Sequence, residues 1–373
     1  MDCIIGNQSS KIHGGFLESI WADFYQLFAM DIEERKKGLL GLDITPEQLK
    51  RALDYLQNDQ PSSDIVALVE CTSYENDELN ESIFHSIDLL KVEEQICSCK
   101  EILIKPNFIE ARFPCQHATT HPAFLEALIC VLRNYTNKKI IVGEGSGHER
   151  DTALVLQNTG LSDVLKKCSV KFVDLNYDDI VLVDVPNPLT LKRIPLPKSI
   201  TSADIVISAP KLKTHHWTGV SLGMKNLLGV FPGSLCGHPK NRLHWASLPR
   251  AIADLVSVIK PELTIIDGIV GIEGNGPLDG VEKKANVIIS GTNVFSTDIA
   301  ACNVMGFLPV TIPKFWFCSL KEIGSPSPRI KAKEIKKVVD HFLPPPVLGL
   351  LMQISKNRNK EIMDFFKDFL NFR

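Results

Sequence analysis

The sequence lacks the features that mark several large classes of protein. Lys and Arg do not outnumber Asp and Glu, and the formal charge of -3 gives no electrostatic reason to expect general nucleic-acid binding. The longest apolar region, at 342–354, is broken by three prolines and falls short of the roughly 18 apolar residues that a membrane span needs. The amino-terminal residues do not resemble a secretory signal. We therefore expect a cytoplasmic protein with neither a nucleic-acid partner nor a membrane span.

Cysteine is present, but not in the patterns that bind metal or build a disulfide framework. The ten cysteines are irregularly spaced, no C-x-x-C occurs, and the only close pair is Cys97 and Cys99. A reduced, intracellular protein is the simpler interpretation, with most thiols packed as small apolar side chains.

The chain of 373 residues is long enough to bury a sizeable core, and its composition is that of a globular protein. Residues 1–60 show helical spacing and predict a helical N-terminal extension. Residues 61–310 predict an α/β core. Residues 311–373 are first Pro- and Lys-rich and then end in an amphipathic helix, which we expect to dock on the body.

Short apolar, β-branched runs alternate with helical segments through the core. This alternation is typical of a doubly wound α/β fold with a mostly parallel sheet. The segment 178–200, with its prolines, favours an antiparallel excursion instead. We expect strands at 64–70, 101–106, 138–145, 170–175, 203–210, 262–268 and 285–291, and helices at 122–135, 161–168, 248–259 and 296–307.

Polar clusters follow four of these strands, and ligands of α/β proteins usually bind beyond the carboxyl ends of the strands. The first cluster is EGSGHERDT, where Gly145 and Gly147 allow the backbone to approach an anionic cofactor. His148 follows them, and a histidine at a strand end suits proton transfer. The alternative for this segment is a capped loop with no ligand.

The second cluster, KLKTHHWTGVSLGMKNLLG, begins at Lys211. On extended backbone Lys211, Lys213 and His215 share one face, and His216 points away. Lys225 falls on a helix that turns back toward this segment. We predict that His215 is catalytic, that Lys225 binds a cofactor, and that Lys211, Lys213 and His216 bind substrate.

The third cluster, IIDGIVGIEGNGPLDG at 265–280, combines five glycines with Asp267 and Glu273. In such a loop a carboxylate could act as a base, orient an imidazole or bind a divalent metal. We predict a catalytic role for Glu273 and a metal-binding role for both carboxylates. A bend that needs glycine only for its geometry is the alternative.

The fourth cluster follows the strand at 101–106. Lys105 and Asn107 are candidates for holding a substrate carboxylate or phosphate. His117 and His121 have the spacing of a metal pair on a helix, but Pro122 indicates that the helix only begins there.

These motifs resemble domain-of-unknown-function family 362 across roughly residues 64 to 310. The resemblance rests on LIKPN, GEGSG, ADIVISAPKLKTHHWTGVSLGMKNLLG and DGIVGIEGNGPLDG. Members of that family often carry a ferredoxin-like module with cysteines for [4Fe-4S] clusters. This sequence has no such cysteine run, so we expect no iron–sulfur cluster.

A more distant similarity is to the lactate racemase family. SGHER looks like that family's first catalytic histidine segment and matches His148. His215, followed ten residues later by Lys225, looks like its second histidine and the lysine that bears a nickel-pincer nucleotide. The resemblance implies a histidine pair that exchanges a proton with a small hydroxy acid.

The sequence therefore predicts an enzyme of isomerase or lyase type that acts on a small anionic metabolite. His148 and His215 would be the acid–base pair that isomerises, epimerises or dehydrates it, with or without a metal. A redox enzyme with a metal or organic cofactor, or a non-catalytic anion- or metal-binding module, remains the alternative. A second copy of the chain is the other candidate partner.

Overall fold

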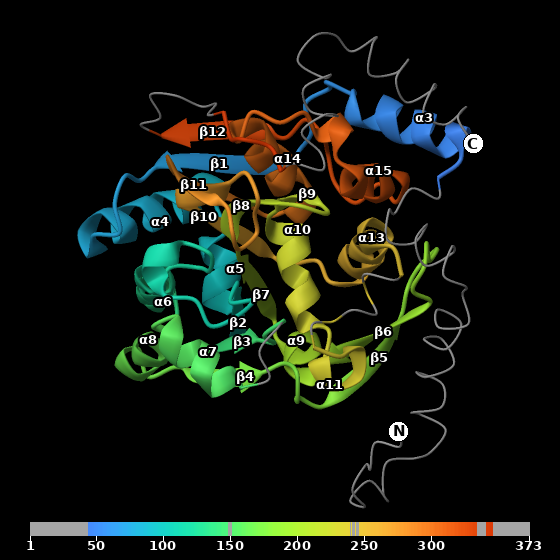
Figure 1. Cartoon of the computed structure of the whole chain (residues 1–373). Helices are drawn as coiled ribbons and strands as arrows, with labels where there is room; N and C mark the ends of the chain where they lie inside the picture. The colour runs from blue at the N-terminus through green and yellow to red at the C-terminus, as the bar shows by residue number, and fades with distance from the viewer. Residues whose placement is uncertain are drawn as a thin grey trace, which may run out of the picture.

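The structure is a computed structural model that describes residues 44–147, 151–238, 240, 243, 246–333 and 341–345. Ten strands in this part of the chain form one sheet. Off its main path, β8 pairs with β10, and β9 pairs with β8 (Figure 1). The order along the main path is β12-β1-β11-β10-β7-β2-β3-β4. The strands are β1 (Ile65–Glu70), β2 (Glu101–Pro106), β3 (Lys139–Glu144), β4 (Lys171–Asp174), β7 (Ile205–Ala209), β8 (Lys211–His215), β9 (Gly219–Ser221), β10 (Leu263–Glu273), β11 (Val281–Gly291) and β12 (Arg329–Lys333).

The sheet is mostly parallel, which confirms the predicted α/β class. All neighbouring strands from β4 through β3, β2 and β7 to β10 are parallel, and β12 is parallel to β1. β11 runs antiparallel to both of its neighbours. The predicted excursion at 178–200 is also confirmed, because β5 (Ile180–Asp184) and β6 (Arg193–Pro197) form a separate antiparallel pair.

Helices cover both faces of the sheet (Figure 1). Alternate residues of β2 show the two layers, because Ile102 and Ile104 belong to one buried apolar cluster and Leu103 to the other. The helices are α3 (Pro46–Leu56), α4 (Asn76–Leu90), α5 (Glu93–Ser98), α6 (Pro122–Tyr135), α7 (Thr152–Asn158), α8 (Leu161–Lys167), α9 (Lys198–Ser202), α10 (Gly223–Asn226), α11 (Gly233–Cys236), α13 (Leu248–Val258), α14 (Val294–Val304) and α15 (Pro313–Leu320), with short 3-10 turns η1 (Pro114–Gln116), η2 (Leu227–Val230) and η3 (Pro309–Thr311).

The third polar cluster differs from the prediction. The sequence predicts a strand that ends at 268 and then a glycine-rich loop, but β10 continues to Glu273 and pairs with β11 up to Val281. The glycines fit a strand here because β8 lies tightly against them: a Cβ on Gly271 would collide with the carbonyl oxygen of Leu212. Only residues 274–280 connect the two strands.

Of the predicted N-terminal helical extension, the described part contains one helix. Thr45 caps α3 through a capping box, and Pro46 is its first residue, as the sequence predicts. Its Leu49 and Leu53 join the same apolar cluster as helices α13 to α15, so α3 packs on the body. The predicted helical stretch before residue 44 and the amphipathic C-terminal helix lie outside the described residues. The division at residues 60 and 310 remains a prediction.

Searching the described residues finds no helix with the length and apolar character needed to cross a bilayer.

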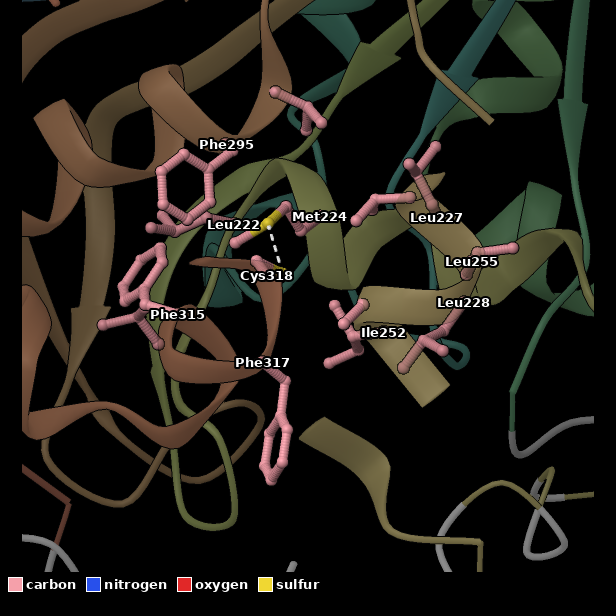
Figure 2. Close-up of a cluster of buried hydrophobic side chains, with 14 of the residues drawn as sticks. Leu222, Met224, Leu227, Leu228, Ile252, Leu255, Phe295, Phe315, Phe317 and Cys318 are labelled. Atoms are coloured by element: carbon pink, nitrogen blue, oxygen red, sulfur yellow. Dashed lines mark hydrogen bonds between the residues drawn. The ribbon is translucent and has the colours of Figure 1, made fainter. Parts of the chain in front are cut away.

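Figure 2 shows the apolar cluster behind α10. Met224 of α10 contacts Cys318 of α15, with 3.6 Å between the two sulfur atoms. Leu222 and Leu227, at the two ends of the short helix, are buried in the same cluster as Phe295. Packing against this cluster therefore fixes one face of α10. The residues that follow Met224 in the helix, Lys225 and Asn226, face a different surface.

Candidate active site

A cavity of about 420 Å³ lies beyond the carboxyl ends of β2 and β3, where the sequence predicts a ligand site. The ends meet because β2, β3 and β7 are parallel neighbours. Apolar side chains, among them Phe108, Leu228 and Leu248, form part of the wall. The polar side chains that line the cavity are Asn107, Glu144, His215, His216, Lys225, Asn226, Lys240, Asn275 and Asp279.

The two adjacent histidines line this cavity together, and their rings stack with centroids 4.7 Å apart. His216 does not point away from His215 as expected for extended backbone, because β8 ends at His215 and the chain turns. The Nδ1 atom of His215 accepts from the backbone N–H groups of Trp217, at 3.0 Å, and Thr218, at 3.3 Å. In the neutral ring the proton of His215 is therefore on Nε2.

His216 has the opposite arrangement. Its Nδ1 lies 3.0 Å from the carbonyl oxygen of Gly276, and a carbonyl only accepts, so Nδ1 carries the proton. The lone pair of the neutral His216 ring is then on Nε2. The backbone thus assigns one imidazole of the pair as a donor at Nε2 and the other as a base at Nε2.

Lys225 lies in the same cavity, on the predicted helix after the histidines. The helix is held in place by Asp298, which accepts from the backbone N–H groups of Gly223 at 2.7 Å and Met224 at 3.1 Å. Among the described residues no hydrogen-bond acceptor faces the Lys225 amine. Burial, followed by repulsion from Lys314 and other lysines, lowers the pKa of Lys225 to about 7.

Lys105, predicted to bind substrate, is fully buried behind the cavity and does not line it. Its Nζ lies 2.6 Å from Oε2 of Glu144 and 3.3 Å from Oδ1 of Asn226. Asn226 in turn donates to the carbonyl of Lys105 at 3.0 Å and to Ser208 at 3.1 Å. Burial lowers the pKa of Lys105 and raises that of Glu144, while the pair's mutual attraction opposes both shifts. Lys105 thus positions Glu144 and Asn226, which do line the cavity.

Glu144 and Asn226 were missed by the sequence reasoning, although each stands inside a motif that it quoted. Lys240 was also missed, because it follows no predicted strand. Its Nζ donates to the carbonyl of Gly145 at 2.9 Å and to that of Gly229 at 2.8 Å. Burial lowers the pKa of Lys240 to about 8, so most of this group is still cationic at pH 7.

Gly145 and Gly147 line the cavity, as their assignment to a cofactor site requires. Close packing already explains Gly145, because a Cβ there would lie 2.6 Å from Oδ1 of Asn176 and 2.8 Å from the carbonyl oxygen of Gly229. His148 follows this loop, but it lies outside the described residues. The predicted pairing of His148 with His215 therefore stays a prediction.

Lys213 is fully buried beside the cavity and has no carboxylate partner among the residues that the structure describes. Its Nζ donates to Oδ1 of Asn107, at 2.7 Å, and to the carbonyl of Ala118, at 2.5 Å. Burial and then repulsion from Lys225 and Lys211 lower the pKa of Lys213 well below its usual value. Lys213 therefore orients the cavity residue Asn107 and does not line the cavity itself.

Lys211 and Asp267 form a second buried group that does not line the cavity. The Lys211 Nζ lies 2.8 Å from Oδ2 of Asp267 and 2.6 Å from the hydroxyl of Tyr74. Asp267 also accepts from Tyr74 and from the backbone N–H of His121. Its carboxylate thus ties β10 to the start of α6, and this contact set is that of a structural ion pair.

The remaining metal candidates are dispersed in the described residues. Glu273, at the end of β10, accepts from the backbone N–H of Leu343 at 2.9 Å and does not line the cavity. The Nδ1 atom of His121 accepts from Ala123 at the start of α6, and its ring stacks on Tyr74. Within the described ranges no three His, Cys, Asp or Glu side chains are grouped to hold a metal ion.

The chain is similar to a curated protein and to a solved structure. The chain is 26% identical to the thylakoid-associated protein sll1697 of Synechocystis sp. over 220 residues, which cover 57% of this chain and 65% of the relative. The matched segment thus spans just under two thirds of that protein's length. The lactate racemase apoprotein from Thermoanaerobacterium thermosaccharolyticum aligns with a TM-score of 0.40 and 15% identity, over 64% of this chain and 56% of the racemase.

A family model also matches the chain. It covers residues 102–303 and includes β2, β3, β7, β8, α10 and β10, which build the cavity or support it. This match takes in more than half of the 373 residues. The chain belongs to the family described as Domain of unknown function (DUF362).

Proposed function

We propose that the cavity is the active site of an isomerase-type enzyme that moves a proton on a small metabolite bearing a carboxylate or phosphate. The observation that carries this proposal is the histidine pair in the cavity, with a proton assigned to Nε2 of His215 and a lone pair to Nε2 of His216. A base and an acid side by side are what removal of a proton next to an oxygen-bearing carbon needs.

In this mechanism His216 takes a proton from carbon, and His215 donates a hydrogen bond to the oxygen on which negative charge develops. The Lys240 ammonium attracts the anionic group of the substrate. The lowered pKa of Lys225 keeps about half of this group neutral at pH 7, so the cavity does not hold two full positive charges. His148 remains the predicted second base for reactions that need one on the opposite face of the carbon.

The nickel-pincer nucleotide implied by the racemase resemblance can be compared with this cavity. Its attachment point fits, because the Lys225 amine lies in the cavity with no acceptor among the described residues. A metal would have to arrive with the nucleotide, since the described side chains form no metal-binding group of three. When bound, the group would supply a metal centre beside the imidazoles, while His215 and His216 keep their roles in proton transfer.

Proton exchange with solvent tests the proposal directly. The full-length protein is incubated in D2O with lactate, malate, 3-phosphoglycerate and pyruvate, and loss of the C–H signal is followed by proton NMR. His216→Asn is the informative variant, because the Asn amide can still donate to Gly276 but offers no base. We expect it to slow exchange by about 100-fold or more.

His85→Asn is the matched control, because His85 lies on α4 and does not line the cavity. We expect this variant to exchange at the wild-type rate. Saturable binding of a probe without any exchange would contradict the enzyme proposal and favour the anion-binding module.

A further inference from the structure

The lysines around the cavity differ in whether their amines contact a hydrogen-bond acceptor. Lys105 faces Glu144, Lys211 faces Asp267, and Lys314 lies 3.4 Å from Oδ2 of Asp298. Lys213 and Lys240 each donate to two oxygen acceptors. All five amines are therefore bound to oxygen.

Lys225 has no such acceptor in the described part of the chain. It lines the cavity, as Lys240 does. The charged groups that lower its pKa, Lys314, Lys105 and Lys240, are all lysines. An amine that is desolvated among like charges loses its proton easily, and a neutral lysine amine is a nucleophile toward carbonyl carbon.

We propose that Lys225 is a covalent carbonyl-binding residue, whose neutral amine condenses with the carbonyl carbon of a small 2-oxo acid in the cavity. This inference rests on the proposed function, because it takes the cavity as the substrate site. It names the substrate class of that site and gives the reaction a covalent intermediate.

The substrate class follows from the groups around the amine. The carbonyl must reach Lys225, and a carboxylate beside it is attracted by the Lys240 ammonium, which its two carbonyl contacts hold in the same cavity. The Nε2–H of His215 is a donor for the departing oxygen. The volume of about 420 Å³ is large enough to admit a short acid.

The condensation balances without an oxidant or a reductant. The amine lone pair of Lys225 forms the C–N bond, and the carbonyl oxygen becomes a hydroxyl. The C–O bond then breaks, and both amine hydrogens leave with that oxygen as water, which gives the imine. The imine withdraws electrons from the neighbouring carbon, and His216 is the base that can remove a proton there.

Reductive trapping tests the inference. The full-length protein is incubated at pH 7 with pyruvate and sodium cyanoborohydride, which converts an imine into a stable secondary amine, and the digest is mapped by mass spectrometry. We expect the adduct on Lys225 at a level at least about tenfold above that on Lys166 in the same digest. Lys166 is the internal reference, because its side chain is 81% exposed.

Two comparisons test whether labelling reflects a specific site or only the general reactivity of lysine amines. Lys225→Arg keeps a cation but cannot form an imine, and we expect it to lose the adduct while its circular dichroism is unchanged. Butanone, a ketone of similar size without a carboxylate, should label Lys225 less than pyruvate does. Equal labelling by butanone would overturn the assignment to 2-oxo acids.

The covalent role of Lys225 would be overturned by labelling that follows exposure alone, by an adduct on Lys240 instead, or by a group already attached to Lys225 in the purified protein.

The labelling result is independent of the proton-exchange result. If exchange depends on His216 and no adduct forms, the covalent step fails and the proposed function stands. If the adduct forms and no exchange occurs, the proposed function fails and Lys225 is a carbonyl-binding residue only.

Discussion

The Nζ atom of Lys105 lies 2.6 Å from Oε2 of Glu144 at the adjacent ends of β2 and β3, and both side chains are buried. The other oxygen of Glu144 accepts from the backbone N–H of Gly145 at 2.9 Å. The pair therefore fixes the first residues of the loop that leads from β3 into the cavity.

Removing the cation of this pair should destabilise the fold. Lys105→Met removes the cation that is hydrogen-bonded to the buried Glu144 carboxylate, and we expect a loss of about 3–5 kcal/mol in the free energy of unfolding. Chemical denaturation measures it. The double variant Lys105→Met/Glu144→Gln should lose less than the single variant, because no buried charge remains. A double variant that is less stable than Lys105→Met would show that the charge is not the cause.

Lys213 predicts a dependence of stability on pH. Its pKa is lowered in the folded state, so between that pKa and the unfolded value near 10.4 the unfolded chain binds more protons. The contribution of Lys213 to stability therefore rises with pH through this window. Unfolding of the wild type and of Lys213→Met at pH 7, 8 and 9 should give a difference that grows in favour of the wild type. Parallel curves would show that Lys213 titrates alike in both states.

The reactivity of Lys225 should follow its own titration. With a pKa of about 7, the neutral fraction of this amine rises roughly tenfold between pH 6 and pH 8. Reductive labelling of Lys225 should rise with it, and the mass-spectrometric assay above measures this. Lys240→Met removes one of the cations that lower this pKa, so its labelling midpoint should move to higher pH. An unshifted midpoint would show that Lys240 does not act on Lys225.

The cavity wall has no room for a side chain at Gly229. A Cβ at this position would collide with Oε1 of Glu144 and with the amine of Lys105. Gly229→Ala should therefore cost about 1–3 kcal/mol or more, measured by thermal or chemical denaturation. Gly143→Ala is the control, because its Cβ would meet only the side chains of Leu175 and Leu103, at 3.2 Å or more. Equal losses in the two variants would mean that the buried ion pair can shift aside.

The sequence predicted seven of the ten strands described in the sheet and the edge at which the cavity lies, but not β8, β9 or β12. Parallel strands that are buried on both faces are continuous apolar runs, such as 203–210. They are easy to recognise because nearly every position is apolar. The extension of β10 to Glu273 was not predictable in this way. It depends on β8 lying against Gly271, which is a contact between segments far apart in the sequence.

The sequence identified several of the residues that line the cavity, but not how the residues around it pair with one another. His215, His216, Lys225 and Asn107 were named and do line the cavity, because each follows a strand end or the turn after it. A sequence does not show which of several lysines meets a carboxylate, so Lys105 and Lys211 were not recognised as members of buried ion pairs. Lys240 could not be found because its place is set by contacts with Gly145 and Gly229.

The helix α10 is one turn long, with Met224 in the apolar cluster of Figure 2 and the next two residues, Lys225 and Asn226, lining the cavity. A change of side-chain volume at Met224 should therefore shift the Lys225 amine. The protein therefore has two separate means of changing its reactivity in evolution or by design. Residues of the cavity decide what is admitted, whereas Met224 and the side chains that support it decide where the Lys225 nucleophile stands.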